Sequence, residues 1–358
     1  MPTVTAQSGE LIFGDKYPFS LNFQRTLRIP DDDKTYPLPP GLGRFPILAV
    51  ADYADRVPAA WRERGGFFIP MYQREALWIS FSGRSWRPNA VKIGIGRINA
   101  VSGRPWDTDL LPADEDYVVC PPQPWLDGIN AGDGFIRQFV AMPLGMGYTV
   151  EAQLTGKEEF GGIQIVVFEP RPGRFPDEPP PQAKALYRGD ALFAMAPPPS
   201  PMPASAEMGL GAGGRMKQKI YPDPHGYDTW DVDTAVTVDV HIVNSLLYRE
   251  ITGQAPPPSP VSAQTYTQYG FPWFDLYDEH MADVRPPTTL VSVQSVQQLD
   301  EAHGVPPQPD DASVDVGAQQ VITYDVDETT GVEKPDADPE ADAGWWAGVK
   351  RFFGGQPD

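Results

Sequence analysis

The amino-acid sequence predicts a mainly β protein: an antiparallel sandwich or barrel-like body with few short helices, followed by a smaller mixed segment and a disordered acidic tail. Two observations point to the β class, namely short runs of alternating apolar residues and the turn residues that bound almost every run. A third is the proline content, 42 of 358 residues, more than twice the usual share of about 5%. Because proline disrupts helix interiors and central strands, this content indicates many turns and sheet edges.

Residues 1–176 form the predicted β-rich domain. In "YPFSLNFQRTLRIP", Phe19, Leu21 and Phe23 alternate with polar residues, which is the period of a half-buried strand. Similar short runs follow in "EALWISFSG", "AVKIGIGRINAVSG", "DYVVC", "GYTVEAQLTG" and "GGIQIVVFEP". The best helix candidate is "DYADRVPAAWRERGG", which should end at Gly65 and Gly66.

Residues 177–219 are predicted to be a linker and loop rich in proline and glycine. The segment "GLGAGGRMKQK" has glycines at the spacing of a dinucleotide-binding fingerprint. That motif needs a strand before the glycines, and the preceding "PPPSPMPASAEM" has too many prolines to supply one. We therefore reject the motif and expect a flexible, exposed loop.

Residues 220–304 are predicted to be a second β or mixed segment packed on the body. The alternation in "TAVTVDVHIVN" predicts a strand, and "SLLYREITG" predicts a helix that ends at Gly253. Ser262 is a candidate N-cap for another short helix. The aromatic residues of "FPWFDLYDE" are predicted to dock against the body, because large aromatic side chains dominate protein cores.

Residues 305–341 are predicted to be a disordered acidic tail. From residue 306 to the end the chain has 12 acidic and 3 basic residues, a composition that cannot bury enough apolar surface to fold alone. Residues 342–355 then carry a cluster of large apolar side chains. On a helix these side chains fit an arc of roughly 120°, the width of a docking stripe. The stripe consists of Trp345, Trp346, Val349, Phe352 and Phe353.

The stripe is the strongest binding candidate in the sequence. About ten residues are too few for a stable isolated helix, so the segment should fold against a receiving surface. A groove on another protein is the favoured receiver, and the body of the same chain is the first alternative. A membrane surface is a weaker alternative, because the cations Lys350 and Arg351 are outnumbered by nearby acidic residues.

The net charge of −20 argues against a nucleic-acid partner, whose phosphates would be repelled. The one cysteine, Cys120, excludes an intrachain disulfide and is predicted to be an inert core residue. Neither a signal peptide nor an apolar run of about 20 residues is recognisable, so we expect a cytoplasmic protein.

A divalent metal is the only cofactor for which the sequence offers a candidate site. In "YPDPHGYDTWDVD" the side chains of Asp223, His225 and Asp228 supply oxygen and nitrogen ligands, although ordinary turn chemistry explains the same residues. The acidic stretch from Asp31 to Thr35 is predicted to be a solvated loop.

The leading functional hypothesis is a soluble, non-enzymatic binding or structural protein that is tethered to a protein partner through the terminal stripe. The alternative is a hydrolase-like or metal-dependent enzyme with its site around Asp223, His225 and Asp228. A third interpretation is a subunit of an oligomeric assembly, in which the "FPWFDLYDE" segment would pack into a neighbouring copy.

Overall fold

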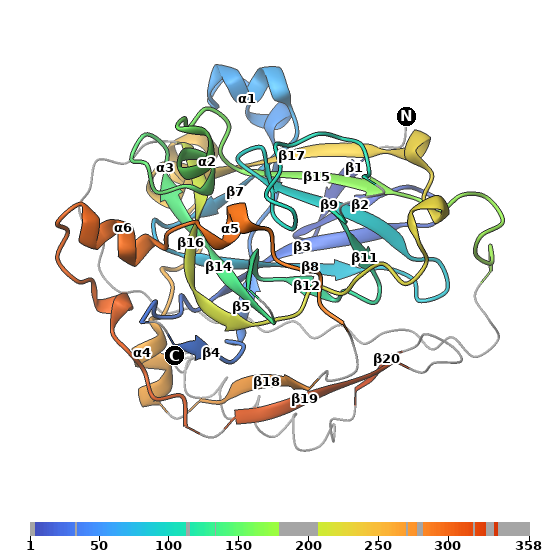
Figure 1. Cartoon of the computed structure of the whole chain (residues 1–358). Coiled ribbons are helices and arrows are strands. Elements are labelled where there is room, and N and C mark those ends of the chain that lie inside the picture. Colours follow the sequence, from blue (N-terminus) through green and yellow to red (C-terminus); the bar gives the residue numbers. More distant parts are fainter. Residues whose placement is uncertain are drawn as a thin grey trace, which may run out of the picture.

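The structure is a computed structural model that describes residues 4–32, 34–111, 115–132, 134–178, 207–269, 271–277, 282–317, 319–326 and 333–335. As predicted, the described chain is mainly β, with a large antiparallel sheet and few short helices (Figure 1). Within the described residues, 17 strands belong to the large sheet. They are β1 (Val4–Gln7), β2 (Glu10–Phe13), β3 (Phe19–Thr26), β4 (Thr35–Tyr36), β5 (Gly41–Arg44), β6 (Leu48–Ala49), β7 (Phe67–Met71), β8 (Ala76–Ser82), β9 (Asn89–Ile95), β10 (Ile98–Asn99), β11 (Val118–Cys120), β12 (Trp125–Leu126), β13 (Gly128–Gly132), β14 (Phe135–Pro143), β15 (Ile163–Phe168), β16 (Glu207–Lys217) and β17 (Val236–Asn244).

The large sheet is built from consecutive antiparallel pairings. β1, β2, β3 and β8 are neighbours, β8 joins β14, and β14 pairs with β16 along most of its length. β16 pairs with β17, and β17 pairs with β15. β15 also pairs with β9, and β9 pairs with β11. Two pairings are parallel, β4 with β16 and β7 with β17. β17 thus lies inside the sheet formed by residues 1–176, although it belongs to the predicted second segment.

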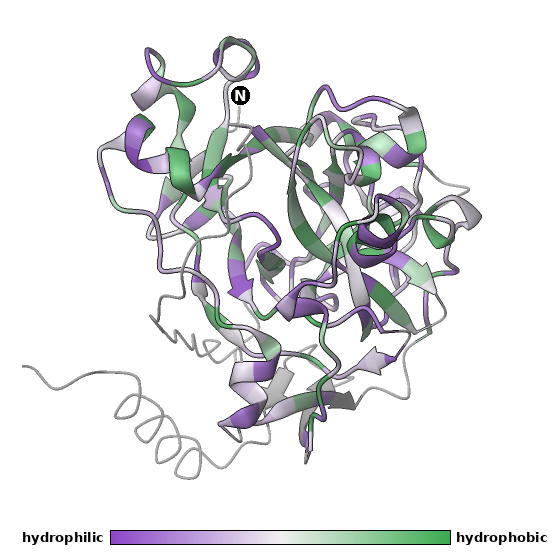
Figure 2. Ribbon diagram, turned by 90° about the vertical axis from the view of Figure 1, so that its left-hand side faces the viewer, coloured by the Kyte–Doolittle hydropathy of each residue, from purple (hydrophilic) through white to green (hydrophobic). Residues whose placement is uncertain are grey.

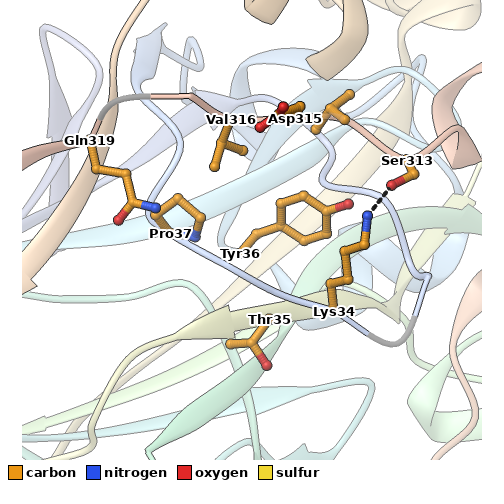
Figure 3. Close-up of a pocket in the computed structure, with 9 residues that line it drawn as sticks. Lys34, Thr35, Tyr36, Pro37, Ser313, Asp315, Val316 and Gln319 are labelled. Carbon is orange, nitrogen blue, oxygen red and sulfur yellow. Dashed lines mark hydrogen bonds between the residues drawn. The ribbon is translucent and has the colours of Figure 1, made fainter.

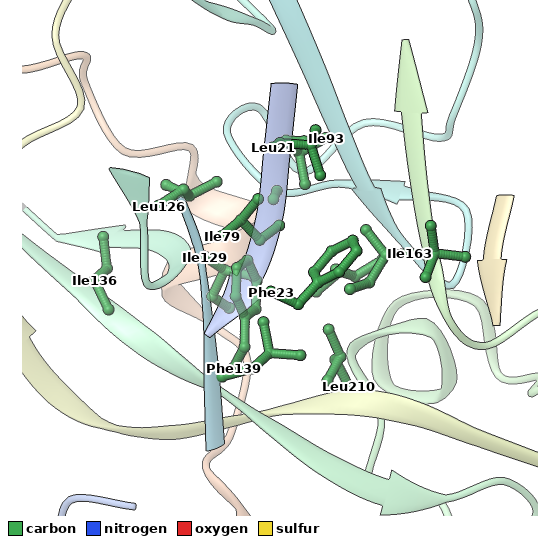
Figure 4. Packing of buried hydrophobic residues seen from close by; sticks show 14 of the residues in the cluster. Leu21, Phe23, Ile79, Ile93, Leu126, Ile129, Ile136, Phe139, Ile163 and Leu210 are labelled. Atoms are coloured by element: carbon green, nitrogen blue, oxygen red, sulfur yellow. The ribbon is translucent and has the colours of Figure 1, made fainter. Parts of the chain in front are cut away.

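The sheet curls around one apolar core. Side chains from β3, β8, β9, β14 and β16 point into a common interior (Figure 4). Phe23, Ile79, Ile93, Phe139 and Leu210 are at most 1% exposed there. Burial of each such side chain contributes roughly 1.5–3 kcal/mol, so this interior is the main source of stability.

Short helices lie at the periphery of the sheet, and hydrophobic residues concentrate in the central strands (Figure 2). The run "GYTVEAQLTG" is predicted to be a strand, but it contains the helix α2 (Val150–Thr155), because the Thr149 side chain caps its start and Gly156 ends it in the left-handed conformation. The predicted boundaries are confirmed for three helices, and Gly65 ends the first of them, α1. Gly253 ends α3 in the left-handed conformation, and the Ser262 side chain accepts a hydrogen bond from the Thr265 N–H at the start of α4. The helices are η1 (Val50–Tyr53), α1 (Ala59–Arg64), α2 (Val150–Thr155), η2 (Tyr227–Thr229), η3 (Val232–Thr234), α3 (Ser245–Thr252), α4 (Ala263–Gln268), α5 (Thr288–Val291), α6 (Val296–Ala302) and η4 (Pro309–Asp311).

A second, three-stranded sheet contains β18 (Trp273–Tyr277), β19 (Gln319–Val326) and β20 (Glu333–Pro335). β18 lies within the aromatic segment "FPWFDLYDE", which is predicted to dock against the body. Trp273 is fully buried, with its ring 6.1 Å from the Tyr36 ring, and therefore docks against the body of its own chain.

The glycine-rich segment from residue 209 to 214 is part of β16, so the predicted flexible loop is wrong in this region. The glycines are required by close packing. A Cβ on Gly211 would lie 2.7 Å from the Tyr148 carbonyl oxygen, and one on Gly214 would lie 2.2 Å from the Pro30 carbonyl oxygen. Glycine in a strand often marks such an approach of another backbone. The preceding residues 179–206 lie outside the described residues.

The predicted disordered tail begins too early. Residues 305–317 are described, and Asp311 in η4 is buried. Arg28 and Arg74 contact Asp311 and hold this stretch against the body. Composition alone does not predict these contacts. The predicted terminal segment 342–355 lies outside the described residues.

A methyl group added at Gly214 should clash with the backbone that approaches β16. G214A should lower the free energy of unfolding by roughly 1–3 kcal/mol, because the strand or the Pro30 backbone must shift. G41A is the matched control, since the nearest atom to its Cβ would be a Trp78 ring carbon at 3.4 Å. Urea denaturation of both variants measures the difference, and equal losses would show that β16 relaxes freely.

Asp127 is a buried carboxylic acid between β12 and β13. One carboxyl oxygen accepts a hydrogen bond of 2.6 Å from Gln218 Nε2, and the Asp127 N–H donates to Gln218 Oε1 over 3.0 Å. Burial raises the pKa of Asp127 from 3.8 to about 7, although the side-chain hydrogen bonds from Trp125 and Gln218 oppose the rise. The folded chain therefore holds a proton that the unfolded chain releases at lower pH.

The contribution of Asp127 to stability should fall as the pH rises from about 4 to about 7, because only the folded state keeps the proton in that window. D127N removes this titration and keeps an acceptor for Gln218. The free energy of unfolding of D127N minus that of the parent should rise with pH across this window, by about 1.4 kcal/mol per pH unit, and level off above it. Denaturation at a series of pH values tests this, and a constant difference would contradict it.

Candidate functional site

Asp223, the first residue of the predicted metal site, uses its carboxylate inside the protein. One oxygen accepts hydrogen bonds of 2.8 Å from both the Tyr117 hydroxyl and Trp230 Nε1. The other accepts the His225 N–H over 2.7 Å. Desolvation, followed by the hydrogen bond to Asp223, raises the pKa of Tyr117 far above its ordinary value. Asp223 therefore orders a corner of the fold through three internal donors.

The other two predicted ligands do not complete a cation site. The His225 ring packs edge-on against Phe175 and Trp230, with centroids 5.0 and 6.1 Å away. Burial lowers the pKa of His225, although Asp223 opposes the shift. The Asp228 carbonyl accepts a hydrogen bond from Arg174. Over the described ranges, no group of three or more His, Cys, Asp or Glu side chains is arranged to hold a metal ion.

Two other groups with catalytic potential are buried. Cys120 is 1% exposed, and burial raises the pKa of its thiol well above the ordinary value. Since the thiolate is the reactive form, this thiol is inert at neutral pH. His241 stacks on Trp61 with centroids 4.6 Å apart, and burial lowers its pKa to about 4.

A pocket of about 500 Å³ opens where residues 34–37 face residues 313–319 (Figure 3). β4 and the residues beside it form one wall, and the stretch that follows η4 forms the other. Its lining mixes cationic, anionic, amide and apolar side chains. The described lining residues are Lys34, Thr35, Tyr36, Pro37, Ser313, Val314, Asp315, Val316 and Gln319.

A hydrogen-bond network joins the two walls. Lys34 Nζ donates to the Ser313 hydroxyl over 2.5 Å, and the Tyr36 hydroxyl donates to Asp32 over 2.8 Å. Burial raises the pKa of Tyr36. Burial also acts to raise the pKa of Asp32, but hydrogen bonds from Ser313, Tyr36 and the Lys34 N–H outweigh it and lower that pKa. The raised pKa keeps the Tyr36 phenol neutral at neutral pH, and the lowered pKa keeps the neighbouring Asp32 ionised.

The stretch that bears Ser313 is fixed by an ion-pair cluster, which we call the arginine clamp. Arg28, which follows β3, and Arg74, which precedes β8, both contact Asp310 and Asp311. The distances to Asp311 are 2.9 Å from Arg28 Nη2 and 2.8 Å from Arg74 Nη2. Arg74 Nη1 also lies 2.6 Å from Asp300 in α6. The two guanidiniums outweigh desolvation and hold the pKa of Asp310 below its usual value.

The arrangement suits binding better than covalent chemistry. The pocket brings together polar groups that can hold a ligand, and there is no histidine or cysteine among its described lining residues. Sequence reasoning missed the pocket because its walls are nearly 280 residues apart and no local pattern predicts that pairing. It also placed Asp31 in a solvated loop, whereas the Asp31 side chain is 4% exposed and lies 3.2 Å from Arg137 Nη1.

The predicted partner-binding residues Trp345, Trp346, Val349, Phe352 and Phe353 lie outside the described residues. No family model matches the chain, and neither a curated protein nor a solved structure matches it. Among the helices that the structure describes, none is both long and apolar enough to cross a membrane.

Removal of one clamp carboxylate should release the wall of the pocket. D311N leaves the buried Arg28 and the partly buried Arg74 short of one anion, so it should cost roughly 3 kcal/mol and speed amide exchange over residues 305–317. Hydrogen exchange read by mass spectrometry locates the change. E301Q, at an exposed position in α6, is the control and should leave exchange there unaltered. Unchanged exchange in D311N would show that apolar packing alone holds the segment.

Proposed function

We propose that this chain is a non-enzymatic binding protein that attaches to a protein partner through its C-terminal aromatic stripe. The observation that carries the proposal is the arginine clamp, which fixes residues 310 and 311 to the body. The chain that leads to the stripe therefore starts from a defined place beside the pocket. A folded body whose C-terminal extension begins at a fixed position is the architecture of a tethered binding protein.

The chemistry of the body supports binding over catalysis. Asp223, His225, His241 and Cys120 are each engaged in internal packing or hydrogen bonds. Catalytic acids and bases need access to a reacting atom, which the buried Cys120 and His241 side chains lack. The pocket beside residues 313–319 offers a place where a ligand or an extended stretch of a partner would be held.

The sequence between β20 and the stripe suits a tether. Nine residues lie between Pro335 and Trp345, and the ten Cα–Cα steps that join them allow a reach of at most about 35 Å. Asp336, Asp338, Glu340 and Asp342 repel one another and favour an extended chain. Such a tether raises the local concentration of the stripe near a partner held by the body, so two weak contacts reinforce each other.

The test uses the full chain with a photoreactive residue in place of Val349, irradiated in lysate of the native cell. We expect one dominant cross-linked protein, which is lost in a variant that carries W345A, W346A, F352A and F353A together. R351A is the matched control, because Arg351 lies on the opposite side of the predicted helix and should not affect cross-linking. The purified captured protein should then bind the full chain at least about tenfold more tightly than the quadruple variant.

Two results would overturn the proposal. A cross-link within the same chain, with faster amide exchange in the body of the quadruple variant, would show that the stripe docks in cis. Co-sedimentation of the parent, but not the quadruple variant, with vesicles of phosphatidylcholine and phosphatidylglycerol, without a protein cross-link, would show a membrane surface as receiver.

A further inference from the structure

β1 is an edge strand of the large sheet, because within the described chain it pairs with β2 alone (Figure 1). The side chains of Thr5, Ala6 and Gln7 are all exposed. Alternate side chains of a strand point to opposite faces of the sheet, so both faces of β1 are open over these residues. The described structure therefore leaves the outer edge of β1 accessible to another strand.

The turn that joins β1 to β2 fixes the direction of the backbone groups. Ser8 and Gly9 are its two central residues, with φ of 52° and 74°. Positive φ at both positions is the signature of a type I′ hairpin turn. In such a turn the flanking residues, here Gln7 and Glu10, form the first hydrogen-bonded pair of the hairpin.

Alternate residues of β1 then direct their backbone groups to opposite sides. The N–H and C=O groups of Thr5 face β2, and those of Val4 and Ala6 face away from the sheet. On that side no backbone hydrogen bond joins Val4 or Ala6 to another described residue. The outer edge thus offers donors and acceptors at two positions that are two residues apart.

Other edge strands of the large sheet carry protection against pairing that β1 lacks. Pro37 follows β4, Pro121 follows β11, and β6 has only two residues. Proline and short length are devices by which natural proteins prevent an edge from pairing with another chain. β1 has four residues, without a proline, a charged side chain or a bulge.

The charge distribution favours a second copy of the chain at this edge. The stretch from Val4 to Gly9 has no charged residue. The next residue, Glu10, is buried and lies 3.1 Å from Arg44. Because the chain has a net charge of −20, two copies repel each other over most of their surfaces. At β1 a second copy meets no like charge on the facing strand.

We propose that β1 pairs with β1 of a second copy in an antiparallel, two-fold symmetric dimer. With the two-fold axis at Thr5, Val4 of each copy exchanges both backbone hydrogen bonds with Ala6 of the second copy. Every outward N–H and C=O group of Val4 and Ala6 is then satisfied. Thr5 lies directly opposite Thr5 of the second copy, a favourable cross-strand pair, and Val4 packs beside Ala6 on the other face.

The dimer joins two large sheets at their edges and is weak. Two strands of four residues bury less than the roughly 1,200–2,000 Å² of a stable interface. If the stripe binds as proposed above, the dimer presents two stripes to a partner, which increases avidity. The pairing itself does not involve the stripe, so the failure of either proposal leaves the other intact.

Sedimentation equilibrium of the full chain from about 10 to about 500 μM, a range that covers weak interfaces, should show reversible association to a dimer. A6P removes an outward N–H without affecting a hydrogen bond to β2, so it should weaken the dimer at least about tenfold. A6S keeps that N–H and is the matched control, which should associate like the parent. Amide exchange read by NMR should slow at Val4 and Ala6 as the concentration rises, and should not change at Thr5 and Gln7.

A charge-swap pair tests the register without a proline. T5K and T5E should each dimerise less than the parent, because the two-fold axis places like charges directly opposite each other. An equimolar mixture of the two variants should restore the dimer, since Lys then faces Glu. A parent that stays monomeric over this range, or a mixture that associates no better than either variant alone, would overturn the proposal. Equal association of A6P and A6S would assign the dimer to another surface and overturn it as well.

Discussion

The arginine clamp is the interaction on which the arrangement of the C-terminal half depends. Arg28 follows β3 and Arg74 precedes β8 of the large sheet. Together they contact the carboxylates of Asp300, Asp310 and Asp311. The Tyr148 hydroxyl donates to Asp300 over 2.8 Å and extends the cluster to the loop before α2. Burial of charges is costly unless partners satisfy most of their hydrogen bonds. Here several guanidinium donors and carboxylate acceptors meet, so the cluster specifies one position for α6 and η4.

A neighbouring buried ion pair also helps to fix an irregular segment to the large sheet. Arg25 and Glu75 lie 2.6 Å apart with both side chains almost fully buried. Arg25 also donates to the Pro258 carbonyl over 2.5 Å, and the Tyr72 hydroxyl donates to the Pro257 carbonyl. The segment rich in proline after α3 cannot pair as a central strand, because proline lacks the N–H. Side-chain donors of the sheet bind its carbonyls instead, which keeps an irregular segment in one place.

Several acidic side chains act as acceptors for internal hydrogen-bond donors in the folded chain. Asp223, Asp311 and Glu151 are acceptors for internal donors, and Glu151 receives the consecutive N–H groups of residues 159, 160 and 161. Carboxylates used in this way order loops and turns, because a chain with many loops leaves many backbone donors unpaired. The same use explains why clusters of acidic residues in the sequence do not produce a metal centre in the described structure.

The sequence by itself determined the β class, the positions of several strands and several helix ends. These features depend on local periodicity and on capping residues such as Ser262 and Gly253, whose preferences act within a few residues. Tertiary structure alone decided that the glycines of β16 form a strand, because the reason is the approach of Pro30 from far along the chain. It also decided that Arg28 meets Asp311. Contacts between distant residues leave no periodic pattern, so a single sequence could not predict the pocket.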